Sequence, residues 1–292
     1  DKPRPSMVSS ASGAVAVSVG GETAAALRRV CLSERATEMH GLVAAWSALL
    51  CRYTGQEEVM VGFALGNREH EAVGGVLGFF VNTIAVRLKC VASGSFVEGV
   101  RGARREVLGS MERGWVPFTE VVGAVGGSGR GSRGVYQTML MYEGGFDGGE
   151  GEEGSASAFF SGLEYVPDDA SPTQGATSEL DMHVAPVGGT RGGYEGRLAY
   201  RSELFEERTM ECMVSAFVQL LEGAVAAPDA AMGTLGLLGE GEQQLLLHEW
   251  NDTAQAYAAD VMAPELFERQ AAAGDERVAL VCEVCMIGSV SA

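Results

Sequence analysis

Residues 77–87 read Leu-Gly-Phe-Phe-Val-Asn-Thr-Ile-Ala-Val-Arg, and this stretch is the starting point for predicting the fold. Ile84 and Val86 are β-branched, and the mixture of apolar and polar residues around them is typical of a central, mostly buried strand. Asn82 and Thr83 interrupt the apolar run with groups that need hydrogen-bonding partners when buried. Two interpretations stay open: the pair is a satisfied polar network in the core, or it lines a cavity.

Composition limits the classes of function. The 292 residues are enough for one large domain or two small ones, and 46% of them are hydrophobic. A net charge of −18 should repel nucleic acid and anionic lipid. The longest apolar run, 41–50, is too short to span a bilayer, and no basic-then-apolar leader precedes it. We therefore expect a cytoplasmic protein with neither nucleic acid nor a membrane among its partners.

The cysteines indicate a reducing compartment. Six of them are scattered through a large chain, mostly within apolar patterns, as expected for reduced core thiols rather than a disulfide framework. Only Cys282-Glu-Val-Cys285 has the spacing of a metal or redox pair, and no second pair or histidine lies near it. We expect no metal site. The chain begins with Asp1 rather than Met, which suggests an excerpt from a longer protein.

Apolar periodicity predicts alternating helices and strands along most of the chain. Helices are expected at 22–31, 38–54, 95–113 and 210–225, with a short one opened by Pro117. Strands are expected at 59–65, 81–88, 135–142, 158–166, 179–187 and 196–201. The acidic, Gly-rich insert at 144–154 has too few apolar groups to pack and is expected to be a surface loop.

Several motifs together resemble the condensation domains of nonribosomal peptide synthetases. Gly-Phe-Phe-Val-Asn-Thr at 78–83, followed four residues later by Arg87, is similar to a core motif of that family. Arg-Tyr-Thr-Gly-Gln at 52–56 and Gly-Asn-Arg at 66–68 precede it in the family's order. Asp-Lys-Pro-Arg-Pro at 1–5 resembles the segment that joins the family's two lobes.

Two later motifs match the family only partly. Val-Pro-Phe at 116–118 matches, but the His-Gln-Asp that usually precedes it is replaced by Arg-Gly-Trp at 113–115. The family's Arg-Asp-x-Ser-Arg-Asn-Pro-Leu-Phe-Gln survives only as Ser-Arg-Gly-Val-Tyr-Gln at 132–137.

The resemblance implies a fold and a division of the chain. The fold is α/β, a chloramphenicol acetyltransferase-like lobe in which helices cover a mixed sheet. Residues 1–228 correspond to the second, C-terminal lobe of a two-lobed condensation domain, and 229–256 to an interdomain linker. Residues 257–292 resemble the truncated start of an adenylation domain, with its first helix near 264–270 and its first strand near 278–281.

The resemblance also implies which residues matter. The catalytic signature of the family is His-His-x-x-x-Asp-Gly in the first lobe, whose second His acts on the attacking amine. No His-His pair occurs in this chain, so we assign no catalytic residue. His248 and Asp252 mimic the His-x-x-x-Asp spacing but fall in the linker. The substrate tunnel or lobe interface is expected to include Asn82, Thr83, Arg87 and Asp181.

These features predict one lobe of an enzyme that forms peptide bonds between carrier-bound thioesters in secondary metabolite biosynthesis. The expected partners are the missing N-terminal lobe, peptidyl carrier domains and a downstream adenylation domain. No cofactor is expected to bind directly, and the phosphopantetheine arms of the carriers are substrates. The alternatives are a non-catalytic carrier-docking or scaffold fragment and, more weakly, a free-standing acyltransferase that uses His183 or His248.

Overall fold

The computed structural model describes most of the chain, in two units formed by residues 1–240 and 241–292. The residues described are 1–5, 11–67, 73, 76–90, 92–126, 134–143, 176–189, 192–254, 261–273, 278–282 and 285–288. The predicted acidic insert at 144–154 and the predicted strand at 158–166 lie outside these residues.

The first unit is built on one six-stranded mixed sheet with the order β1-β6-β5-β4-β2-β3. Its strands are β1 (Ser12–Val19), β2 (Glu58–Leu65), β3 (Asn82–Lys89), β4 (Thr138–Tyr142), β5 (Leu180–Pro186) and β6 (Tyr194–Arg201). Strands β2, β4 and β5 run parallel to one another, and β3 and β6 run antiparallel to their neighbours. The mixed sheet is confirmed, and only β1 among these strands was not predicted.

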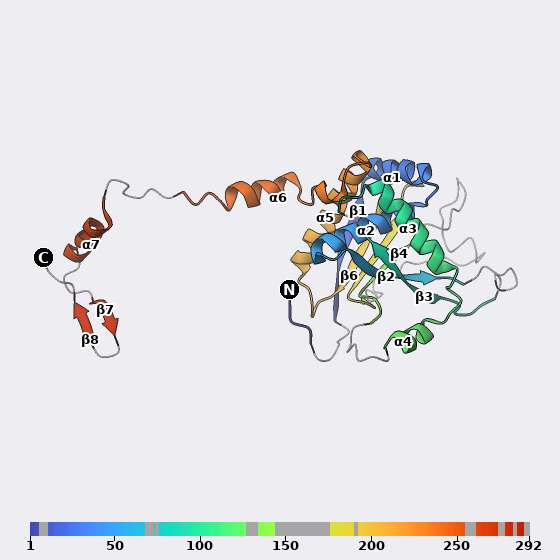
Figure 1. Ribbon diagram of the computed structural model, residues 1–292, viewed down its shortest axis with the longest axis horizontal. Coiled ribbons are helices and arrows are strands. Elements are labelled where there is room, and N and C mark those ends of the chain that lie inside the picture. Colours follow the sequence, from blue (N-terminus) through green and yellow to red (C-terminus); the bar gives the residue numbers. More distant parts are fainter. Residues whose placement is uncertain are drawn as a thin grey trace, which may run out of the picture. The chain divides into compact units, whose positions relative to one another are not determined.

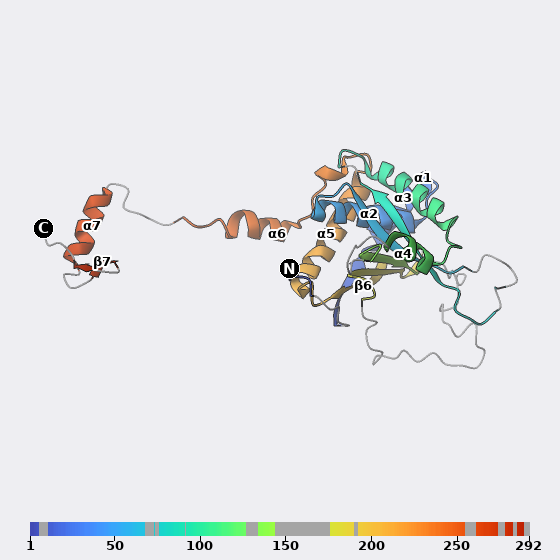
Figure 2. The same ribbon diagram turned by 60° about the horizontal axis from the view of Figure 1, so that its bottom comes forward.

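Four helices cover one face of this sheet. They are α1 (Gly21–Ser33), α2 (Glu38–Thr54), α3 (Phe96–Met111) and α5 (Glu207–Ala226). The short helix α4 (Phe118–Gly126) lies on the other side of the strands (Figures 1 and 2). The sheet therefore has a helix face, packed over its whole width, and a second face that only α4 covers among the described helices.

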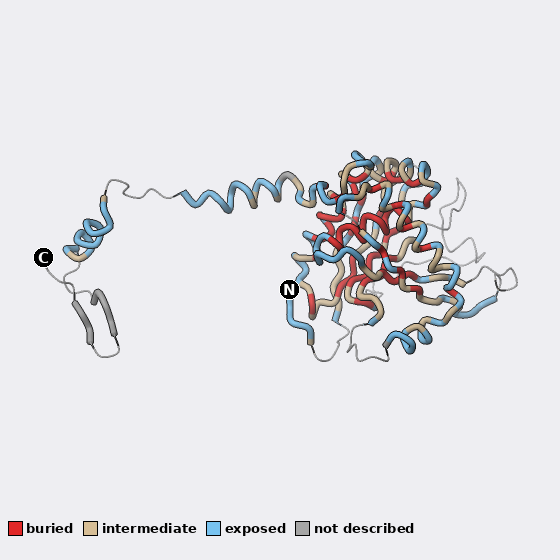
Figure 3. Tube along the Cα trace, viewed as in Figure 1, coloured by how far each residue is buried: buried red, intermediate tan, exposed pale blue. Residues whose placement is uncertain are grey.

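The core lies between the sheet and its helices, where buried residues concentrate (Figure 3). Helix α2 runs through this layer with a continuous buried stretch from His40 to Cys51, as its wide apolar stripe predicts. Trp46 at its centre is 0% exposed and packs edge-on against the Phe217 ring, with the two ring centroids 5.8 Å apart. The Trp46 indole donates to Thr138 Oγ1 on β4 (3.2 Å), so the largest core side chain also satisfies its polar group.

Both ends of α2 are capped by local signals in the sequence. At the start, the imidazole Nδ1 of His40 accepts from the Thr37 backbone N–H (3.0 Å) and contacts the Thr37 hydroxyl (2.8 Å). This is a capping box in which His takes the place of the usual Glu or Gln. At the end, Gly55 adopts φ 69°, a left-handed conformation that suits glycine, and its N–H bonds to the Cys51 carbonyl.

The chain leaves the first unit past the end of α2. The Arg52 guanidinium donates to the backbone carbonyls of Met232 (3.4 Å), the first residue of the short 3-10 helix η4 (Met232–Thr234), and of Leu235 (2.5 Å), the residue after it. Arg52, from the predicted Arg-Tyr-Thr-Gly-Gln motif, thus anchors the exit segment to the core helix.

One described helix is long and apolar enough to cross a membrane by length and composition. It is α5, whose mean hydropathy over the relevant window is 1.2. Its apolar residues, including Met210, Phe217 and Leu221, are buried against the sheet and the neighbouring helices. This amphipathic burial accounts for α5 as a core helix.

The second unit contains short elements. They are α6 (Glu240–Gln244), the π-helical turn η5 (Leu245–Glu249), α7 (Ala263–Ala272) and the hairpin β7 (Val278–Cys282) with β8 (Cys285–Gly288). The Asn251 side chain donates to the Leu246 carbonyl (2.7 Å) and closes the end of η5. Helix α7 and strand β7 fall where the sequence predicts a helix and a strand, and β8 was not predicted.

The His40 capping box should make stability depend on pH. Burial, followed by the charge of Arg104, lowers the pKa of His40 below its ordinary value of 6.5. At acidic pH the unfolded state therefore binds more protons at His40 than the folded state does. The contribution of neutral His40 to the free energy of unfolding is complete above pH 6.5 and is lost as the pH falls through the lower pKa of the folded state. Replacing His40 with Gln keeps a capping-box acceptor that does not titrate.

We expect His40→Gln to reduce the loss of unfolding free energy between pH 7.5 and pH 5.5, measured by urea denaturation. It should not abolish the loss, because burial also lowers the pKa of His183. An unchanged slope in the variant would show that protonation of His40 does not weaken the cap.

Candidate functional site

Asn82 fixes the connection between α3 and α4. Its amide nitrogen donates to the backbone carbonyls of Gly114 and Val116, both at 2.7 Å. Its amide oxygen accepts from the Phe118 N–H at 3.0 Å, at the first residue of α4. The side chain is only partly buried, but its hydrogen-bonding capacity is largely used on backbone groups. In the described residues, Asn82 belongs to a satisfied local network.

Thr83, the next residue, lies on the opposite side of β3, where it lowers the pKa of the Tyr136 phenol. The Tyr136 hydroxyl donates to the Met139 sulfur at 3.5 Å. The Tyr136 ring covers Gly62 on the neighbouring strand, where an added Cβ would lie 2.7 Å from it. The Phe118 ring packs against the Tyr136 ring, with the two ring centroids 5.6 Å apart. Tyr136 is therefore seated between β2, β3 and the start of α4.

Asp181 on β5 is 1% exposed and saturated with hydrogen bonds. It accepts from the backbone N–H and hydroxyl of Thr177 at 2.6 and 2.8 Å, and from the hydroxyl and N–H of Ser178. These donors offset the cost of burying a carboxylate. The Asp181 side chain thereby shapes the turn that leads into β5.

Tyr136 brings these residues together. Burial, followed by the negative charge of Asp181, raises the pKa of Tyr136, so its phenol stays neutral near pH 7. Thr83 and Asp181 thus face a common side chain on the second face of the sheet, and Asn82 holds Phe118 against that side chain. Sequence reasoning missed Tyr136. Two features of the sequence could have indicated Tyr136. It belongs to the partly preserved motif at 132–137, and Gly62 inside a predicted strand leaves space for a large neighbouring side chain.

Arg87 is not part of this group. It lies on the same face of β3 but near the opposite end, where its side chain is 65% exposed. Its nearest charged partner is Glu58, at 3.7 Å. An exposed pair at that distance contributes little to stability.

His183 occupies the middle of the second face, on β5 opposite Arg197 of β6. Burial and the Arg197 charge lower the pKa of His183, so the imidazole is neutral at pH 7. The Nε of Arg197 is buried without a hydrogen-bonding partner. His248 belongs to the second unit and is exposed.

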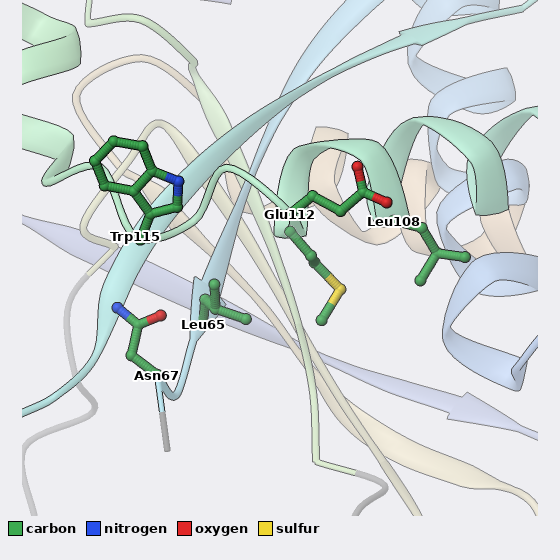
Figure 4. A pocket seen from close by; sticks show the side chains of 6 residues that line it. Leu65, Asn67, Leu108, Glu112 and Trp115 are labelled. Carbon is green, nitrogen blue, oxygen red and sulfur yellow. The ribbon is translucent and has the colours of Figure 1, made fainter. Parts of the chain in front are cut away.

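A shallow pocket of about 390 Å³ opens beside the Asn82 network. Trp115 and Asn67 stand on one side of it, Leu108 and Glu112 project from α3 on the other, and Leu65 lies between them (Figure 4). Trp115 is 78% exposed, and it stands where the family resemblance leads one to expect a polar residue.

Exposed apolar side chains precede β3 at the same end of the sheet. Leu77 is 97% exposed and Phe79 is 89% exposed, both a few residues before Asn82. We call these two residues and Trp115 the apolar rim, residues 77, 79 and 115. Large exposed apolar side chains of this kind are candidates for a surface that another protein covers.

The N-terminal segment is bound to the far end of the sheet. Arg4 makes a two-pronged ion pair with Glu179, at 2.6 and 2.9 Å. Asp1 accepts from the Glu206 N–H at 2.9 Å, at the start of α5, and the Lys2 N–H bonds to the Leu204 carbonyl. Glu179 directly follows the turn shaped by Asp181, so the segment and the turn are held side by side.

The described residues contain no cluster of three or more His, Cys, Asp or Glu side chains arranged to hold a metal ion. Cys282 and Cys285 are paired in the backbone register of the β7–β8 hairpin.

Comparison with known proteins identifies the family. A sequence model of the condensation domain matches residues 1–247. The chain belongs to the condensation domain family. The match includes the β3 motif, the Asn82 network and the N-terminal segment described above.

The curated relatives are large synthetases. The chain is 30% identical over 285 residues to tyrocidine synthase 2 of Brevibacillus parabrevis, covering 97% of this chain and 8% of that protein. It is 28% identical over 272 residues to bacitracin synthase 1 of Bacillus licheniformis, covering 93% of this chain and 5% of that protein. The chain thus spans less than a tenth of either relative.

Solved structures show the same fold. A four-domain nonribosomal peptide synthetase, holo-AB3403, matches 99% of this chain and 22% of its own length, with a TM-score of 0.80 and 17% identity. The X-domain from teicoplanin biosynthesis matches 82% of this chain and 52% of its own length, with a TM-score of 0.71 and 23% identity. The first condensation domain of the CDA synthetase matches 78% of this chain and 48% of its own length, with a TM-score of 0.60 and 18% identity. The chloramphenicol acetyltransferase-like fold class is confirmed.

The Asn82 network yields a stability prediction. Replacing Asn82 with Ala leaves two backbone carbonyls and one N–H of the partly buried α3–α4 connection without their side-chain partner. We expect Asn82→Ala to lower the unfolding free energy, measured by urea denaturation, by roughly 1–3 kcal/mol.

Arg87→Ala is the matched control on the same strand. It removes an exposed side chain whose ion pair is long, so its effect should stay within about 1 kcal/mol. Equal losses for both variants would contradict the structural role assigned to Asn82.

Proposed function

We propose that this chain supplies the second lobe of a condensation domain that joins carrier-bound aminoacyl or peptidyl thioesters through a peptide bond. One observation carries the proposal: the family model matches residues 1–247, while the chain covers only about half of the solved X-domain and CDA condensation domain. The part matched has its own core and sheet, as expected of one lobe.

The chemistry requires groups that the chain does not contain. Its four histidines, at positions 40, 70, 183 and 248, include no adjacent pair. A well-placed general base is typically worth 10²- to 10⁴-fold in rate, and alignment of the two substrates adds a further gain. In this proposal the first lobe provides the base, and the second face of this sheet forms part of the tunnel wall.

The four expected site residues take different parts in the proposal. Asn82 acts indirectly, because its amide positions α4 and Phe118. Thr83 and Asp181 set the position of Tyr136 on the second face. Arg87 is exposed at the far end of β3 and is assigned to the lobe interface.

The remaining expectations follow from the same proposal. The phosphopantetheine arms of carrier domains enter as substrates, and no cofactor is held by the lobe itself. The residues from 257 onward begin an adenylation domain, and 229–256 form the linker to it. Cytoplasmic localisation is proposed from the acidic composition and the free cysteines.

A second candidate function is a non-catalytic docking or scaffold lobe. The observation that favours it is the similarity to the X-domain from teicoplanin biosynthesis, for which a complex with OxyB has been solved. That protein uses a fold of this kind to bind a partner. The experiment below separates the two candidates.

The test compares the chain with a chimera in which residues 1–228 follow the first lobe of the condensation domain that they match in tyrocidine synthase 2. Loaded donor and acceptor carrier domains are supplied, and dipeptide formation is followed by mass spectrometry in single turnover. We expect no product from the chain alone and measurable product from the chimera, lost when the second His of the signature is changed to Ala.

Two outcomes would overturn the proposal. A chimera that folds and binds carriers but makes no product would favour the scaffold candidate. Product from the chain alone, abolished by His183→Ala or His248→Ala, would identify a free-standing acyltransferase.

The apolar rim gives a separate prediction. If it is the surface that the first lobe covers, the isolated chain should self-associate through it. Leu77→Ser combined with Phe79→Ser should shift the sedimentation of the concentrated chain toward the monomer. Leu32→Ser is the matched control, because Leu32 is 74% exposed on α1 at the helix face. An equal shift in the control would remove the rim from the proposed interface.

A further inference from the structure

The second face of the sheet carries an arginine that the fold leaves without a partner. Leu198, the next residue along β6, is buried in the core on the helix face, so Arg197 projects from the second face. The Nε atom of Arg197 is buried and makes no hydrogen bond. In the part of the chain that the structure describes, its guanidinium also forms no ion pair. An unmet buried donor is costly, so the chain alone does not account for this position.

The other arginines that β3 and β6 place on this face do have partners. The Arg201 Nε donates to the Ser178 carbonyl at 3.0 Å. Arg87 lies 3.7 Å from the Glu58 carboxylate. Arg197 is therefore the exception among the arginines on the described strands of this face.

The register of the sheet places His183 beside Arg197. The two residues oppose each other directly on β5 and β6, and the same row continues to Met141 on β4 and Ala16 on β1. Directly opposed side chains on one face of an antiparallel pair have Cβ atoms about 5 Å apart, close enough to share one ligand. Ala16 is exposed and ends at its Cβ, which leaves space over β1 beside the guanidinium.

The electrostatics of the pair leave a positive charge unbalanced. Burial, followed by the Arg197 charge, lowers the pKa of His183, while Asp181 and Glu143 act in the opposite direction. The imidazole is therefore neutral at pH 7 and has one N–H to donate. Asp181 is already saturated by donors from its own turn. Glu195, two residues before Arg197 on the same face, is exposed and forms no ion pair with it.

We propose that Arg197 and His183 together bind an anionic oxygen group, a carboxylate or a phosphate, which a substrate carries onto the second face. The guanidinium supplies the positive charge and a planar pair of N–H donors that includes the unpartnered Nε. The His183 imidazole donates a further N–H. Both side chains bind the anion, and neither takes part in bond making in this proposal.

This inference rests on the proposed function, in which the second face forms part of the tunnel wall. It extends that function by naming the chemistry that the wall recognises. The anion has two possible sources in a carrier-bound thioester: the carboxylate of an acidic aminoacyl side chain, or the phosphate of the phosphopantetheine arm. The shared chemistry is a planar or tetrahedral group of anionic oxygens, which a guanidinium binds through paired hydrogen bonds.

The experiment titrates the whole chain, with isotope-labelled histidines, and follows the imidazole resonances by NMR. The probes carry a stable amide in place of the thioester: aspartyl-pantetheine, its neutral isostere asparaginyl-pantetheine, and alanyl-phosphopantetheine. The His183 resonance is assigned from the spectrum of His183→Gln. We expect an anionic probe to bind and to raise the pKa of His183, because a neighbouring negative charge favours the imidazolium form. The neutral probe should leave that pKa unchanged.

The probes also separate the two sources of the anion. A response to aspartyl-pantetheine alone assigns the site to an acidic side chain, and a response to alanyl-phosphopantetheine alone assigns it to the arm. A response to both supports a general anion site. No response to either anionic probe, or an equal response to the neutral probe, would overturn the proposal.

Variants test whether Arg197 supplies the charge. Arg197→Gln should weaken binding of the active probe by at least about tenfold and abolish the probe-dependent rise in the pKa of His183. Arg197→Lys keeps the charge but not the planar fork, so its affinity should lie between those of the wild type and Arg197→Gln. This second variant also tests the site if the Gln variant fails to fold.

Arg87→Gln is the matched control, because it removes another arginine from the same face of the sheet. It should retain both the affinity and the pKa response. Unchanged binding in Arg197→Gln, or an equal loss in Arg87→Gln, would exclude Arg197 as the anion-binding group. The outcome is distinct from that of the chimera experiment, since it measures binding without turnover and since condensation of neutral amino acids needs no acidic side chain.

Discussion

The second face of the sheet depends on the hydrogen bonds of the Asn82 amide. Without them, the backbone between α3 and α4 would lose the partner of two carbonyls and one N–H at the edge of the core. With them, α4 begins at Phe118 beside the Tyr136 ring. One polar side chain in an apolar strand therefore places an entire short helix on the side of the sheet that the other helices leave open.

The two faces of the sheet are stabilised by different kinds of interaction, apolar packing on one and hydrogen bonds on the other. On the helix face, close packing around Trp46 supplies the hydrophobic stabilisation, with one hydrogen bond to Thr138. On the second face, Asp181 is held by specific hydrogen bonds from Thr177 and Ser178, and the Tyr136 ring packs against Phe118 and over Gly62. Such networks fix geometry more than they add stability, because each group exchanges water for a protein partner. The second face is suited to presenting a defined surface.

Much of this fold could be predicted, because long periodic segments and local caps specify it. The wide apolar stripe of α2, bounded by Thr37 and Gly55, indicated both the helix and its burial. Strand β1 was missed although Val15 and Val17 alternate with small residues, since Ala and Ser give a weak strand signal. Of the site, Asn82 and Asp181 could be identified from motifs. Their meeting with Tyr136 could not, because it depends on strand order across four strands.

The composition of the second face also bears on how a partner lobe would bind. The outward residues of its β1 and β6 strands include Ala14, Ala16 and Ala199, along with polar groups, so little apolar area is available there. The larger exposed side chains Leu77, Phe79 and Trp115 lie outside these two strands. Apolar area for association is therefore offered by these three side chains rather than by β1 and β6.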